Sequence, residues 1–343
     1  MSVQRVDWSK LDDIVDIVSG EFDYEKLTLF SIFKNELFFC QSFFDHYRRL
    51  GVEQFLILDD GSTDGTKQFL EAQDDCVVLS SKLGFEDPVE YHPRPGVRTA
   101  TRAAIFLKAA VPQFFLPNMY SLYVDADEFL ILPPGVANLS ELVRDLRSRN
   151  LGAVASSLID FYPIFISSVS EHAPETSAEI FAMCPYFDCR KLLRISFNGK
   201  PVAKYPSKLR ALAVQHGMRV ESRLRKRIRQ RVRGRALANP MSYKTPLVLH
   251  TPERYYVSSH RVCGRVARDK ILSTAHFVFT PNSWRKAEKI VTGGERRGMK
   301  YEALLGILRG NEIGAVPFVC ARSRRFESAQ QLIDCGLMRW DAR

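Results

Sequence analysis

The stretch from Tyr120 to Leu132 constrains the fold of this chain most tightly. Five mostly apolar residues lead into the carboxylates of Asp125, Asp127 and Glu128, and a second apolar run follows. A short apolar run bounded by a polar turn is typical of a central strand in a parallel sheet. Ligands of open α/β sheets bind beyond the carboxyl ends of such strands, so this acidic turn lies where a site is expected.

Asp125 and Asp127 are two residues apart, and on an extended segment their side chains point the same way. Both can therefore face one ligand. A hard divalent cation that carries phosphate oxygens would satisfy two such carboxylates, whereas two unpaired buried anions would be strongly unfavourable. The alternative is that both are turn carboxylates in water, because D-x-D alone is a short motif.

The chain has 343 residues, enough to bury a substantial core in one large or two modest domains. Its apolar runs are interrupted, for example at Lys108, so the sequence predicts no membrane-spanning helix. The N-terminus has no basic region followed by an apolar core, which predicts no signal peptide. Seven cysteines without a C-x-x-C pair predict reduced packing thiols and a cytoplasmic location.

The net charge of +10 is concentrated in one segment. Between Arg219 and Arg235, nine basic residues stand against Glu221, a local net charge of +8 that leaves +2 for the rest of the chain. Three interpretations stay open: a solvated charged helix, peripheral attachment to the anionic inner face of a membrane, and nucleic-acid binding. The absence of aromatic residues and of a nucleic-acid motif argues against the third.

The first half of the chain alternates strand and helix patterns, which predicts an α/β fold with a mostly parallel sheet flanked by helices. Right-handed crossovers would bring Asn35, Asp59, Asp60 and Asp125 to one edge of that sheet. The predicted strands are 27–33, 54–58, 76–79 and one ending at Asp125; the predicted helices are 8–18, 36–50, 67–72 and 97–111, with a loop over 80–96.

Three polar turns follow these strands in order: K-N-E at 34–36, D-D-G-S-T-D-G-T at 59–66 and D-A-D-E-F at 125–129. In this order the chain resembles the family-2-like glycosyltransferases, which have the GT-A fold, a Rossmann-like arrangement. Pieces at 244–248, around His260 and at 275–277 are similar to a bacterial branch of that group. The resemblance covers most of residues 27–130 and is patchier up to about 305.

The resemblance implies a nucleotide-sugar site. Asp59 or Asp60 would receive the base or ribose of a UDP-type donor, a role that suits a carboxylate accepting imide and hydroxyl hydrogens. Asn35 and Glu36 match a nucleotide-side turn, with a plain helix cap as the alternative for Asn35. Arg102 would contact phosphate or face solvent.

The resemblance also implies a metal. Asp125 would touch ribose or metal, and Asp127 would hold Mn²⁺ or Mg²⁺ against the diphosphate, with His276 completing the metal site. A divalent ion neutralises the charge that develops on the leaving phosphate.

The residue that deprotonates the acceptor is less defined. Asp160 lies in the apolar run 152–168 and is either a buried structural acid or the catalytic base. His260 is an alternative metal ligand or a contact for the acceptor.

Four regions follow: an N-terminal helical extension (1–24), a nucleotide-sugar-binding core (25–215), the basic segment (216–238), and an acceptor-side, helical C-terminal region (239–343). The expected function is metal-dependent, inverting transfer of a sugar to a hydroxyl of a glycan or lipid-linked acceptor, as in surface glycan synthesis. The opposing class is a non-catalytic basic binding protein, a membrane or nucleic-acid adaptor on a degenerate form of the fold.

Overall fold

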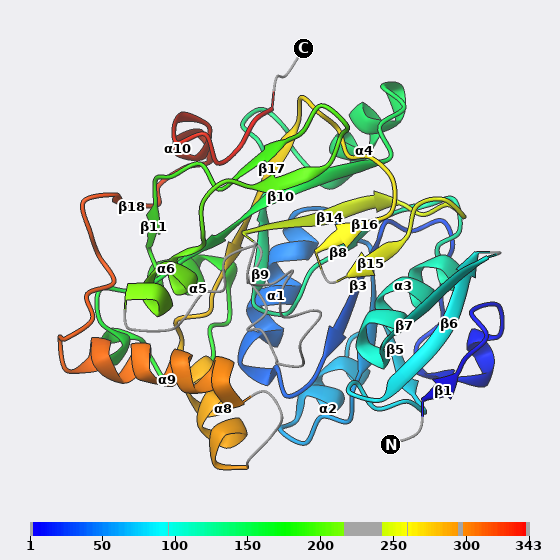
Figure 1. The fold of residues 1–343 in the computed structure, drawn as a ribbon, viewed down its shortest axis with the longest axis horizontal. Coiled ribbons are helices and arrows are strands. Elements are labelled where there is room, and N and C mark those ends of the chain that lie inside the picture. The colour runs from blue at the N-terminus through cyan, green and yellow to red at the C-terminus, as the bar shows by residue number, and fades with distance from the viewer. Residues whose placement is uncertain (1–2, 95, 216–241, 259, 294–297, 341–343) are drawn as a thin grey trace, which may run out of the picture.

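The computed structural model describes residues 3–94, 96–215, 242–258, 260–293 and 298–340. Its centre is a nine-stranded mixed sheet in the order β2-β5-β4-β3-β8-β14-β10-β17-β9 (Figure 1). The strands are β2 (Val15–Ser19), β3 (Thr28–Phe33), β4 (Gln54–Asp59), β5 (Cys76–Ser81), β8 (Tyr120–Tyr123), β9 (Glu128–Ile131), β10 (Ala153–Asp160), β14 (Tyr243–Leu249) and β17 (Ile271–His276). The predicted α/β class is confirmed.

Helices cover both faces of the sheet. The side chains of β3 point alternately to the two faces and show which helix covers each. Leu29 and Phe33 point into the core cluster that contains α1, whereas Phe30 and Ile32 point into the cluster that contains α3. Every residue of β3 is buried, as expected for a strand covered on both sides. The helices are α1 (Leu37–Arg49), α2 (Thr66–Glu71), α3 (Ala103–Phe115), α4 (Leu139–Ser148), α5 (Ser177–Met183), α6 (Lys208–Gln215), α8 (Pro281–Thr292), α9 (Gly298–Glu312) and α10 (Ala329–Asp334).

The strand directions bring many chain segments to one edge. β5, β4, β3 and β8 are parallel, and β10 and β17 run the same way because β14 is antiparallel to both β8 and β10. The carboxyl ends of these six strands therefore meet at one edge. The antiparallel strands β14 and β9 begin there, at Tyr243 and Glu128.

The sheet is more mixed than the predicted one. Among its eight neighbouring pairs four are parallel and four antiparallel, because β2, β14 and β9 run against the others. β14 and β17 come from the region predicted to be helical after residue 239. The core and the C-terminal region are thus interleaved in one sheet.

Two local predictions were wrong. In place of the helix over 8–18 there is a short 3-10 helix (Leu11–Asp13) followed by β2, which is rich in β-branched residues and pairs with β5 at the sheet edge. The loop over 80–96 contains β6 (Pro88–Arg94), which forms a hairpin with β7 (Val97–Arg102); the helix expected from Val97 begins only at Ala103. β1 (Gln4–Arg5) extends this hairpin into a small sheet.

The prediction of seven reduced cysteines was also wrong. Cys189 and Cys335 form a disulfide across 146 positions of sequence. The bond ties the residue after β11 (Tyr186–Asp188) to the end of α10, next to the pairing of β11 with β18 (Ser323–Arg325). Cys40, Cys76 and Cys184 are buried free thiols, as expected for packing residues.

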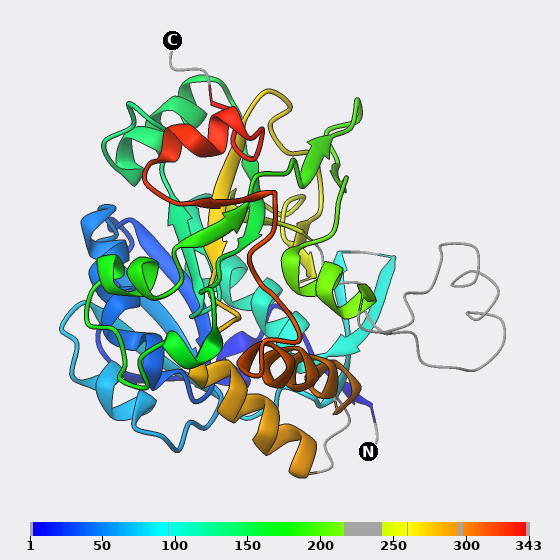
Figure 2. The ribbon, with the colours of Figure 1, turned by 90° about the vertical axis from the view of Figure 1, so that its left-hand side faces the viewer.

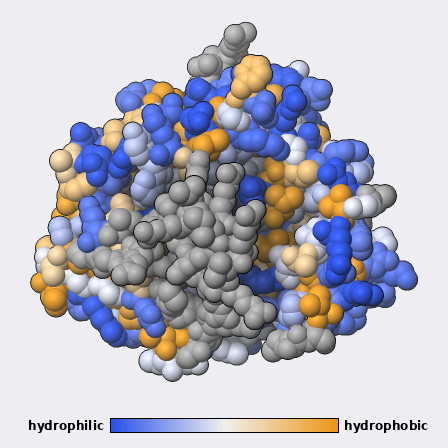
Figure 3. All heavy atoms as spheres, viewed as in Figure 1, coloured by the Kyte–Doolittle hydropathy of each residue, from blue (hydrophilic) through white to orange (hydrophobic). Residues whose placement is uncertain are grey.

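Two pairs of helices lie at opposite ends of the molecule. α8 and α9 lie side by side at one end, and α4 and α10 lie at the other (Figure 2). Among the coloured residues of Figure 3, hydrophilic ones are the most common, with hydrophobic residues in patches between them. Within the described residues, no helix is long and apolar enough to cross a membrane.

His46 on α1 generates a prediction about acid stability. The ring is buried, Nε2 donates to the Leu130 carbonyl at 2.8 Å, and burial lowers the pKa of His46 to about 4. Because the unfolded chain binds this proton near pH 6.5 and the folded chain does not, folding stability is lost as the pH falls from about 6.5 to 4. In urea titrations at pH 7 and pH 4, His46→Gln should reduce that loss by about 3 kcal/mol. His172→Gln, at an exposed position, should not change it; equal pH dependence in wild type and His46→Gln would contradict the prediction.

Candidate functional site

Asp125 follows β8 at the shared edge and is held by three donors. Its Oδ1 accepts from the Tyr123 hydroxyl at 2.6 Å and from Lys108 Nζ at 3.2 Å, and its Oδ2 accepts from Lys244 Nζ at 3.2 Å. Burial disfavours the charge on Asp125, but the two lysines outweigh it and hold the pKa of this carboxyl well below its usual range. Asp125 is a fixed anion whose charge the protein itself balances.

Glu128 is the first residue of β9 and Lys244 is the second residue of β14. Both strands run against their neighbours in the sheet, so both begin at this edge and bring opposite charges to it. The two side chains are ion-paired and almost wholly buried. The carboxylate of Glu128 also accepts from the Asp125 backbone N–H at 2.8 Å, which shapes the D-A-D-E turn. Burial raises the pKa of Glu128, against the lowering effect of Lys244.

His276, the last residue of β17, lies between two carboxylates. Its Nδ1 is 2.7 Å from Asp160 Oδ1, and its Nε2 is 3.4 Å from Asp127 Oδ2. Burial disfavours a charged ring, but Asp127 and Asp160 outweigh it and hold the pKa of His276 well above its usual range. Burial raises the pKa of Asp127, but the neighbouring His276 outweighs burial, so the pKa of this carboxyl is lowered.

Glu36 follows β3 and forms an ion pair with Lys286 of α8. Burial raises the pKa of Glu36 to about 7, with Lys286 lowering it and the nearby Asp127 raising it. A carboxyl at this edge therefore exchanges a proton near neutral pH. The contact also shows that the C-terminal helices reach the edge formed by the N-terminal strands.

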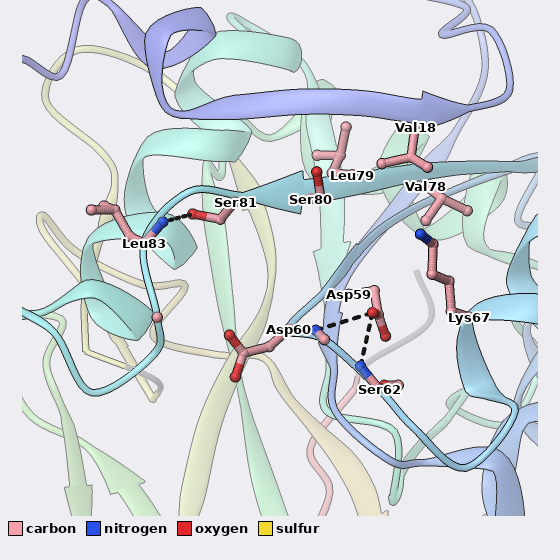
Figure 4. Close-up of a pocket in the computed structure, with 12 residues that line it drawn as sticks. Val18, Asp59, Asp60, Ser62, Lys67, Val78, Leu79, Ser80, Ser81 and Leu83 are labelled. Atoms are coloured by element: carbon pink, nitrogen blue, oxygen red, sulfur yellow. Dashed lines mark hydrogen bonds between the residues drawn. The ribbon is translucent and has the colours of Figure 1, made fainter.

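Asp59 ends β4 beside a cavity of about 460 Å³ (Figure 4). Its Oδ2 accepts from the backbone N–H groups of Gly61 and Ser62 at 3.1 and 3.0 Å, whereas its buried Oδ1 has no hydrogen-bond partner in the described part of the chain. Lys67, in the first turn of α2, lines the same cavity, which continues along β5 to Leu83 and Gly84. Asp60 points away from Asp59 and pairs with Lys34 at 2.8 Å.

The turns after β3 and β4 are tied together by their polar side chains. Asn35, with a positive φ of 55°, accepts from the Thr63 N–H at 2.7 Å and donates its own N–H to Ser62 Oγ at 2.9 Å. The Glu36 N–H donates to Thr66 Oγ1 at 2.9 Å. Asn35 is thus a link between turns and does not cap α1, and Ser62 and Thr63 hold the shape of the second turn.

His260 and Arg102 lie in different settings. The Nδ1 of His260 is 3.1 Å from the Tyr243 carbonyl, and burial lowers its pKa to about 4, so the ring is neutral at pH 7. Arg102, at the end of β7 in the small sheet, pairs with Glu86 at 2.6 Å. The basic segment 219–235 lies outside the described residues.

The described residues contain no group of three or more His, Cys, Asp or Glu side chains that could hold a metal. Asp127 and His276 nevertheless offer a two-ligand donor set. Neighbouring ligands of an ion with bonds of about 2.1 Å lie about 3 Å apart, close to the observed 3.4 Å. Mg²⁺ usually takes one or two protein carboxylates and completes its shell with water and phosphate oxygens, a role that Asp127 fits. The second donor, the imidazole of His276, is a common metal ligand when neutral.

Sequence reasoning missed the cations of the site, Lys108, Lys244 and Lys286. The first two stand inside apolar runs, A-I-F-L-K-A-A-V and Y-K-T-P-L-V-L. A lysine in such a run must either turn to solvent or pair with a buried anion, and that is a usable signal. The sequence around Lys286 carries no such signal, because its partner Glu36 lies 250 positions away.

No family model matches this sequence, and no curated protein matches it.

The burial of Lys244 generates a prediction about stability. Lys244→Met would leave Glu128 and Asp125 without their shared counter-charge, so the free energy of unfolding should fall by about 3–5 kcal/mol. Lys34→Met, which removes the half-exposed partner of Asp60, should change it by at most about 1 kcal/mol. Both values come from urea denaturation at pH 7. Similar losses in the two variants would contradict the role given to the buried pair.

Proposed function

We propose that this protein is a glycosyltransferase of the GT-A type that transfers a sugar from a UDP-type donor to an acceptor hydroxyl. The observation that carries the proposal is the meeting of three polar turns, after β4, β3 and β8, at one edge of the sheet beside the Asp59 cavity. Open α/β sheets bind nucleotides at such an edge. The resemblance of the three turns to the family's motifs supports the same conclusion.

Asp59 and Lys67 suit the uracil base of the proposed donor. The Oδ1 of Asp59, which has no partner among the described residues, can accept an imide N–H from a base in the cavity, and the ammonium of Lys67, which lines the same cavity, can donate to a ring carbonyl. Uracil presents both groups on one edge. Cytosine lacks the ring N–H and presents an acceptor there, so it would leave the carboxylate unpaired.

Asp125, Asp127 and His276 suit the rest of the donor. Asp125, fixed by three donors, would bind the ribose hydroxyls through its remaining acceptor capacity. Asp127 and His276 would hold Mn²⁺ or Mg²⁺, whose charge, when bound, stabilises the diphosphate leaving group. Lys286 and Lys108 add positive charge around the same edge.

The acceptor side of the proposal is coarser. We assign the acceptor to a glycan or lipid-linked hydroxyl at the cytoplasmic face of a membrane, with His260 near its path.

A binder without turnover is the second candidate, and the pairing of Asp125 with two lysines favours it, because such a pair lowers the demand for a metal. Release of UDP from UDP-sugars in the presence of Mn²⁺ separates the two.

Calorimetry with UDP, CDP and GDP in the presence of Mn²⁺ tests the base assignment. UDP should bind more tightly than CDP, and Asp59→Asn should weaken UDP binding about 10- to 100-fold, the effect of losing a hydrogen bond to a charged group. Asp74→Asn is the matched control and should change the affinity less than threefold, since that side chain is exposed and is not among the residues that line the cavity. The proposal fails if none of the three nucleotides binds, and the base assignment fails if the two variants behave alike.

A further inference from the structure

Asp160 and His276 are placed opposite each other by the sheet. They are the last residues of β10 and β17, which pair in parallel, and the register sets Asp160 directly beside His276. The 2.7 Å contact between Asp160 Oδ1 and His276 Nδ1 thus follows from strand pairing in the middle of the fold. It does not depend on a loop conformation.

Asp160 has no oxygen left for a substrate. Its side chain is 1% exposed, and its Oδ2 accepts from the Leu209 N–H at 2.8 Å, in the first turn of α6. Both oxygens are engaged by groups of the protein itself. An acceptor hydroxyl could not reach them, so whatever Asp160 contributes to the site passes through His276.

The contact decides what the other ring nitrogen can do. A carboxylate beside Nδ1 keeps a proton on Nδ1, so the neutral ring presents the Nε2 lone pair toward Asp127. Histidines that bind metals usually donate their second N–H to a carboxylate or carbonyl in this way. Without metal, the same ring can carry a second proton and bridge the two carboxylates.

We propose that Asp160 is a positioning residue that fixes the tautomer and orientation of His276, so that Nε2 and Asp127 together bind the divalent cation of the donor. The inference rests on the proposed function and adds a residue to it. It assigns Asp160 to support of the cation site and away from the role of catalytic base.

Asp160→Asn is a sharp test because it changes one atom. The amide can still accept from the Leu209 N–H through its oxygen, so α6 keeps its start. Its NH₂ group would then face Nδ1, which must become an acceptor, and the ring proton moves to Nε2, the atom needed for the metal. The variant should fold while presenting the wrong tautomer.

Mn²⁺ binding to the full chain, measured by the electron paramagnetic resonance of free Mn²⁺ with and without UDP, gives a readout independent of turnover. Asp160→Asn should weaken Mn²⁺ binding about 10- to 100-fold. Asp188→Asn is the matched control: Asp188 accepts from Lys208 at the start of the same helix, and its change should alter the affinity less than threefold. His276→Gln should lose as much affinity as Asp160→Asn, and the double variant should lose no more, because Asp160 acts through His276.

The outcomes separate the inference from the proposed function. If wild type binds UDP and Mn²⁺ and Asp160→Asn binds Mn²⁺ equally well, or if Asp188→Asn loses as much, the inference is overturned and the function stands. If wild type binds UDP without Mn²⁺, the metal role and the inference both fall. If it binds neither, the proposed function falls. Should Asp160→Asn not fold, the ¹⁵N shifts of His276 in wild type with Mg²⁺ decide: a proton on Nδ1 supports the inference, and one on Nε2 overturns it.

Discussion

The buried ammonium group of Lys244 holds the site edge together. Six strands end at this edge, where Asp125 and Asp127 lie near Glu128 and Glu36, and where His276 joins Asp127 to Asp160. Carboxylates gathered at a buried or half-buried edge repel one another, and without a counter-charge the buried ones would be protonated or would disrupt the edge. Lys244 is fully buried between Glu128 and Asp125, and its antiparallel strand places it there. The two strands that run against the others, β14 and β9, deliver the two halves of this pair.

The carboxylates of the edge differ in how firmly the protein neutralises them. Asp125 is bound by Tyr123, Lys108 and Lys244, so its charge and position are fixed before any ligand arrives. Within the described residues, the side chain of Asp127 has one facing partner, the imidazole of His276, at a distance too long for a strong hydrogen bond. A cation brought by a ligand would therefore compete with a single weak contact at Asp127 and with three short contacts at Asp125. Under the proposed function, this difference favours Asp127 over Asp125 as a ligand of the metal and leaves Asp125 a hydrogen-bonding role.

The sequence predicted the part of the fold that depends on local pattern. Apolar strands 27–33 and 54–58, followed by polar turns, were enough to predict the parallel β3 and β4 and the shared edge of Asn35, Asp59 and Asp125. The antiparallel insertion of β14 beside β8 could not be predicted, since it pairs residues more than 120 positions apart. Pattern also misled at 8–18, where three-and-four spacing of apolar residues fits a helix but edge pairing with β5 stabilises a strand. The disulfide joins Cys189 to Cys335 through the same kind of long-range contact.

The same long-range contacts explain why the site residues from the second half of the chain were the hardest to assign. His276 acquires its setting only when β17 pairs with β10, and Lys286 meets Glu36 only when α8 packs against the turn after β3. The N-terminal turns supply the anions, and the C-terminal strands and helix supply most of the cations that make these anions tolerable. Neither half could hold the site alone, because half of it would be a cluster of uncompensated charge. The interleaving of both halves in one sheet is therefore a requirement of the electrostatics of the edge as much as of the packing of the core.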